Sequence, residues 1–158
     1  MDIAIRDHLQ RVLVWGDAHL TFEAVVKDLN PALRGRRPEG CPHSPWELVE
    51  HLRITQRDIL DFCVADSYEE REWPGGYWPA SPEPPDAGAW DQSVESYGKD
   101  REALRRLARD PKTDLTTITP HATKPDQTYM REILIVADHT AYHVGQLVLV
   151  RRLLGAWP

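Results

Sequence analysis

Two histidines four residues apart near the C-terminus, His139 and His143, constrain this chain more than any other feature of its sequence. In an α-helix, residues at this spacing lie one turn apart on the same face. The apolar residues around the pair recur at intervals of three and four, which predicts a long amphipathic helix. They are Met130, Ile133, Leu134, Ala137, Val144, Leu147 and Val148. Because imidazoles that point into a helical bundle can share a metal ion, the pair suggests a metal site.

The pair alone does not establish such a site. Seven histidines in 158 residues give about 0.3 pairs at this spacing by chance, so coincidence remains an alternative. In that alternative, one histidine packs against apolar neighbours with its ring nitrogen hydrogen-bonded, and the other faces solvent. A stable metal site would also need a third ligand from elsewhere in the chain.

The apolar periodicity predicts four helices, and no alternating strand pattern of useful length occurs, which favours an all-α four-helix bundle. The predicted helices cover about residues 3–29, 45–64, 90–109 and 128–154. The second has the clearest start, because Ser44-Pro45-Trp46-Glu47 forms a capping box with proline at the first helical position. At 158 residues the chain has the size of one domain, expected over residues 1–158.

The segment 65–89 between the second and third predicted helices contains five of the thirteen prolines. It also contains Trp73, Tyr77 and Trp78, an aromatic content that a disordered tether would not usually carry. We therefore predict an ordered crossover that packs its aromatic side chains onto the bundle. Trp73 and Trp78 are candidates for the wall of a pocket.

The third ligand is most simply His51, which lies on the second predicted helix beside Leu48 and Leu52. Two other histidines, His8 and His19, share nearly one face of the first predicted helix and are expected at the surface. A Cys-x-His sequence at 41–43 is interpreted as incidental, because it lies in a connector rich in glycine and proline.

The net charge of −6 and the dispersed basic residues argue against nucleic acid or an anionic membrane surface as a partner. No run of apolar residues approaches the roughly 18 needed to span a bilayer, and no secretory signal is visible at the N-terminus. The two cysteines, Cys41 and Cys63, provide no disulfide framework. We therefore expect a cytoplasmic protein with reduced thiols.

Two segments resemble the DinB-like family, whose pattern is a tryptophan-led helix with one histidine and a late His-x-x-x-His followed by Gly-Gln. The first segment is 44–52, Ser-Pro-Trp-Glu-Leu-Val-Glu-His-Leu. The second is 138–147, Asp-His-Thr-Ala-Tyr-His-Val-Gly-Gln-Leu. Every position of the pattern is filled, and the resemblance extends over nearly the whole chain.

The resemblance implies a four-helix bundle with a long crossover between its second and third helices, frequently a homodimer. It implies that His51, His139 and His143 hold a divalent metal ion such as zinc or nickel. The family includes transferases and isomerases that use low-molecular-weight thiols, so the implied function is a metal-dependent small-molecule transferase of the thiol type or a hydrolase. The alternative is a non-catalytic, dimeric helical module that binds a metal or a ligand. A metallopeptidase is disfavoured, because Thr140 stands where such enzymes carry glutamate.

Histidines that bind a metal usually donate their second N–H to an oxygen atom. Among the acidic residues, Glu23 is the preferred candidate, provided that the first helix flanks the site. Glu50 and Asp138 neighbour the presumed ligands in sequence and therefore point about 100° away on a helix. Tyr142 and Gln146 are also near the pair. None of these residues is assigned as a general base.

Overall fold

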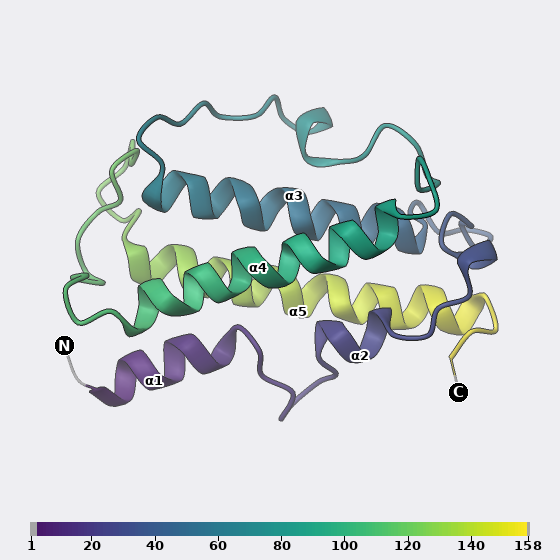
Figure 1. Ribbon diagram of the computed structural model, residues 1–158, viewed down its shortest axis with the longest axis horizontal. Coiled ribbons are helices and arrows are strands. Elements are labelled where there is room, and N and C mark those ends of the chain that lie inside the picture. The colour runs from purple at the N-terminus through teal and green to yellow at the C-terminus, as the bar shows by residue number, and fades with distance from the viewer. Residues whose placement is uncertain (1–2, 158) are drawn as a thin grey trace.

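The computed structural model describes residues 3–157, and within them the chain is all-helical (Figure 1). The helices are α1 (Ile3–Val12), α2 (Phe22–Val26), α3 (Pro45–Val64), α4 (Ala89–Arg109) and α5 (Tyr129–Leu153), with short 3-10 turns η1 (Pro31–Leu33) and η2 (Gly75–Tyr77). The described residues include no strand, apart from one isolated bridge between Ile118 and Thr128. The prediction of an all-α fold is therefore confirmed.

Three long helices form the centre of the bundle, where α3 packs against both α4 and α5. The short helices α1 and α2 follow one another along one side, α1 against α4 and α5, and α2 against α5 (Figure 1). The crossover 65–88 returns along α3, so that α3 and α4 run in the same direction while α5 runs the opposite way (Figure 1). This topology places α3 beside α5, although the two helices are far apart in sequence.

The prediction of one continuous first helix over 3–29 is wrong, because α1 ends at Val12 and α2 begins at Phe22. Gly16 lies in the break, and glycine is unfavourable in a helix interior. Thr21 then starts a new helix, since its side chain accepts a hydrogen bond from the Ala24 amide at 3.2 Å. Both local signals outweigh the apolar spacing that suggested one helix.

The predicted capping box at the start of α3 is present. The Ser44 hydroxyl accepts a hydrogen bond from the Glu47 amide at 3.2 Å, and the Glu47 carboxylate accepts one from the Ser44 amide at 2.8 Å. Glu47 also accepts a hydrogen bond from Arg37 Nε at 2.8 Å. These contacts define where α3 begins and therefore the direction in which His51, one turn further on, points.

The core between the long helices is centred on Tyr97 of α4, which has no solvent-exposed surface. Its ring packs on that of Phe22 at a centroid distance of 4.1 Å. Its hydroxyl shares a hydrogen bond of 2.9 Å with Thr140 of α5, and its carbonyl accepts one of 2.7 Å from Gln56 of α3. One residue thus connects α2, α3, α4 and α5.

The buried side chain of Arg151 joins α5 to the segments around it. Its guanidinium donates hydrogen bonds to the carbonyls of Val25, Lys27 and Ala156. The ring of Trp157 lies against the same guanidinium, 4.6 Å from its centroid. This arginine therefore holds α2 and the C-terminal residues on the end of α5.

By length and composition alone, α5 is long and apolar enough to cross a membrane. The sequence-based expectation concerned an uninterrupted apolar run, and polar residues such as Asp138 and His139 interrupt α5. A single helix of this kind is weak evidence, because the core helix of a soluble bundle has the same composition. Here α5 packs against α1, α2, α3 and α4.

Candidate metal centre

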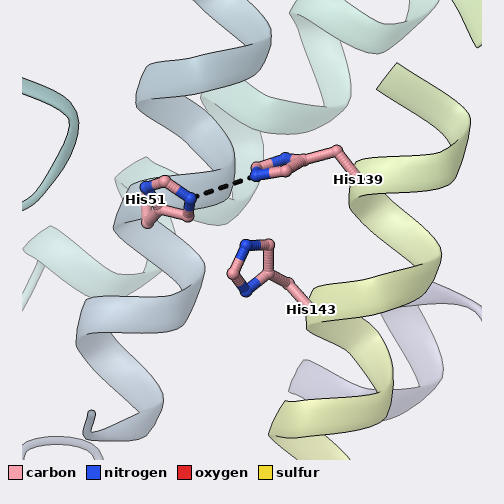
Figure 2. Close-up of side chains that lie close together, drawn as sticks. All are labelled: His51, His139 and His143. Atoms are coloured by element: carbon pink, nitrogen blue, oxygen red, sulfur yellow. Dashed lines mark hydrogen bonds between the residues drawn. The ribbon is translucent and has the colours of Figure 1, made fainter. Parts of the chain in front are cut away.

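Three histidines from two helices meet inside the bundle: His51 from α3, and His139 and His143 from α5 (Figure 2). One ring nitrogen of each lies within 4.8 Å of the others. His51 Nε2 and His139 Nε2 are 3.1 Å apart. The structure thus brings together the three histidines that the sequence singled out, and the one-turn spacing of His139 and His143 places both rings opposite His51.

The outward-facing nitrogens of these rings have partners. His51 Nδ1 lies 2.7 Å from the Tyr77 carbonyl, and His143 Nδ1 lies 2.8 Å from Gln146 Oε1. His139 Nδ1 has a longer contact of 3.5 Å with the Thr55 hydroxyl. Because a carbonyl oxygen favours a proton on Nδ1, the contacts of His51 and His143 leave their Nε2 lone pairs free to bind a shared ion.

The electrostatics of the cluster favour neutral rings. Burial lowers the pKa of all three rings, and the pKa falls to about 3 for His139 and to about 4 for His143. Charge repulsion from the neighbouring rings adds to the shifts of His139 and His143. Neutral imidazoles that turn lone pairs toward a common point repel one another unless a cation lies between them. In a tetrahedral site with metal–nitrogen bonds of about 2.0–2.1 Å, ligand nitrogens lie roughly 3.3 Å apart. The donor set therefore fits a divalent metal ion and leaves at least one coordination position open.

Trp78 of the crossover holds the His51 ring in place. The two rings are stacked with their centroids 3.9 Å apart and an interplanar angle of 6°. Trp78 also stacks on His43, with a centroid distance of 4.0 Å and an angle of 10°. Together with the Tyr77 carbonyl, this stacking restricts both the tilt and the rotation of His51.

A cavity of about 490 Å³ opens beside the cluster, and most of its wall is apolar. Its lining comprises His43, His51, Thr55, Asp58, Ile59, Trp73, Tyr77, Trp78, Ile135, His139, Tyr142, His143 and Gln146. Trp73 and Trp78 line it, as predicted for a crossover that forms a pocket wall. A small molecule in this cavity would reach the three histidines directly.

The acidic residues considered as second partners of the histidines are engaged elsewhere. Glu23, the preferred candidate, pairs with Arg101 of α4 instead. Glu50 accepts hydrogen bonds from Arg53 and Ser93. Asp138 lines a separate shallow cavity. Only Gln146, among the residues named as near the pair, contacts one of the rings through a hydrogen bond.

Three groups in contact with the histidines or with Trp78 were not found by sequence reasoning. Thr55 lies four residues after His51 on the same helical face, so its spacing could have identified it. The carbonyl of Tyr77 carries no sequence signal, because any residue at that place in the crossover would supply one. His43, interpreted as incidental, lines the cavity through its stack on Trp78, whereas Cys41 packs against the core.

Lowering the pH from 7 to 5 is expected to destabilise the metal-free protein by about 2–4 kcal/mol. His139 and His143 have pKa values of about 3 and about 4 in the fold, against 6.5 in an exposed ring. Below pH 6.5 the unfolded chain therefore takes up protons that the native protein does not, and stability falls as the pH falls. Urea denaturation at both pH values measures the difference. A double variant with His139→Ala and His143→Ala should lose clearly less stability over the same change of pH. An equal loss of stability would assign the effect to other groups.

Comparison with known proteins identifies a family. The family model described as the DinB superfamily matches residues 17–147, a range that includes all three histidines of the cluster. No curated protein and no solved structure matches the chain significantly.

Proposed function

The chain belongs to the DinB superfamily, and from this premise we propose that it is a metal-dependent enzyme that acts on a small molecule, as a transferase of the thiol type or a hydrolase. The observation that carries the proposal is the position of the three-histidine cluster. Its inward lone pairs leave a coordination position free, and an apolar cavity lies beside it. A purely structural metal site would instead be closed by a fourth protein ligand.

His51, His139 and His143 would hold the ion, and zinc and nickel both suit imidazole ligands. The ion would supply a nucleophile at neutral pH, by lowering the pKa of a bound water to about 7 or by deprotonating a bound thiol. The chain contributes the rest. Tyr77 and Gln146 orient two of the imidazoles through hydrogen bonds, and Trp78 covers His51 and excludes water from one side of the site.

The proposal includes a cytoplasmic homodimer with a small-molecule substrate and with neither nucleic acid nor membrane as a partner. Support for the dimer comes from α5, which leaves large apolar side chains on its outer surface. The exposed fractions are 47% for Leu134, 63% for Tyr142, 55% for Leu149 and 56% for Leu153. A second copy of the chain packed on this face would remove them from water. Sedimentation of the purified protein tests this part of the proposal.

Metal analysis followed by cobalt substitution tests the proposed function. We expect about one divalent ion per chain, and we expect the visible spectrum of the cobalt form to change when a small thiol is added. The change reports a sulfur atom entering the open position. A cobalt spectrum that does not change when thiols or substrate analogues are added would instead support the alternative, a non-catalytic metal-binding module. His139→Ala serves as the control that should not yield the cobalt spectrum.

A further inference from the structure

Asp58 is the only formally charged residue among the described residues that line the cavity beside the histidines. It lies on α3 seven residues after His51, so both side chains project from nearly the same face of the helix. Its side chain is 12% exposed. A single, partly buried carboxylate in a largely apolar pocket is the kind of group that orients a ligand.

The contacts of Asp58 leave its charge only partly compensated. Its carboxylate accepts hydrogen bonds from the hydroxyls of Tyr68 and Tyr77, both at 3.2 Å. Arg71 Nε is 3.7 Å away on a side chain that is 44% exposed, so this ion pair is weak. Burial raises the pKa of Asp58 despite these partners. A cation bound beside the carboxylate would therefore stabilise it.

The rest of the pocket also suits a cation. Trp73, Tyr77 and Tyr142 line the same cavity, and aromatic faces attract ammonium groups. A second cavity of about 670 Å³, with a more polar wall, shares Asp58, Ile59 and Tyr77 with the first. Asp58 thus lies where an apolar, aromatic compartment meets a polar one.

We propose that the substrate carries a protonated primary amine, which binds Asp58 while its reactive group reaches the three histidines. The inference rests on the proposed function, because it names the class of substrate that the same site takes. Seven residues of helix span about 10 Å, so the amine and the reactive atom should be separated by a chain of roughly five or six bonds.

Thiols of matched length test the proposal on the cobalt-loaded protein. 5-Aminopentane-1-thiol should bind at least tenfold more tightly than 5-mercaptopentan-1-ol, as measured from the cobalt spectrum. Asp58→Asn keeps an oxygen that accepts the two phenol hydrogen bonds but removes the charge. It should reduce the preference for the aminothiol over the hydroxythiol to less than threefold and leave the affinity for the hydroxythiol unchanged. Asp61→Asn is the matched control, because Asp61 lies on the same helix, pairs with Arg57 and does not line the histidine cavity; it should keep the preference.

Equal affinity of the wild-type protein for the amine and the alcohol would overturn the proposal, whatever the variants do. An equal loss of preference in Asp61→Asn and Asp58→Asn would also overturn it, because the effect would then be general electrostatics. If no thiol changes the cobalt spectrum, the proposed function fails instead. Calorimetry with pentylamine and pentanol then tests the amine site separately. The proposal of an amine site holds if pentylamine binds the wild-type protein more tightly than it binds Asp58→Asn. It is overturned if pentylamine binds the two proteins equally.

Discussion

Replacing His139 with alanine is expected to weaken the binding of Zn²⁺ by about 100-fold or more, while the metal-free protein stays folded. The variant keeps only two imidazoles, which do not hold the ion well. The fold should survive because His139 is only partly buried and belongs to neither of the two apolar core clusters. His51→Ala and His143→Ala should behave in the same way.

Competition against a coloured chelator measures this affinity, and circular dichroism reports the fold. His8→Ala is the matched control, since His8 is exposed on α1 and lies outside the cluster. It should bind Zn²⁺ as tightly as the wild type. If His139→Ala kept the wild-type affinity, the metal would be bound elsewhere and the proposed function would lose its basis.

Replacing Tyr97 with alanine is expected to lower the free energy of unfolding by about 4 kcal/mol, the usual cost of removing a large buried aromatic side chain. The substitution would leave a cavity beside Phe22 and remove the hydrogen bond to Thr140. Tyr97→Phe removes only the hydroxyl and should cost about 1 kcal/mol. Thr140→Val, which removes the other partner of the same hydrogen bond, should cost a similar amount.

Urea denaturation of the metal-free proteins gives these values. The Zn²⁺ affinity of Tyr97→Phe should remain within about threefold of the wild type, because Tyr97 does not contact the histidine rings. A larger drop would mean that the Tyr97–Thr140 hydrogen bond sets the position of His139, the residue before Thr140. A loss of less than about 2 kcal/mol in Tyr97→Ala would show that the core can close around the missing ring.

The long helices could be predicted because their local signals agree with their tertiary packing. For α3, the capping box and the apolar spacing both lead to the observed range Pro45–Val64. The N-terminal segment differs, because Gly16 and the Thr21 cap oppose an apolar pattern that continues through them. Apolar spacing reports which side chains become buried, and a break between two helices on the same side of a bundle leaves that spacing intact.

The site was predictable to the extent that it depends on helices. The spacing of His139 and His143 and the apolar neighbours of His51 suggested the cluster, and the resemblance to the DinB-like family implied the same three ligands. The Tyr77 carbonyl and the Trp78 stack depend on the path of the crossover, which is decided by contacts far apart in sequence, such as Ser44 with the Pro82 carbonyl at 2.6 Å. Asp58 was missed because only the cavity distinguishes it from other helical carboxylates.

The histidine cluster joins α3 and α5 through residues that are 88 positions apart in sequence. An ion bound there would act as a reversible cross-link between them, because the unfolded chain does not hold the three rings together. At a free-metal concentration 100 times the dissociation constant, this linkage adds about 2.7 kcal/mol to stability. The amount of this protein that survives proteolysis in a cell would then follow the supply of metal, so that starvation for the ion would remove the polypeptide as well as its activity.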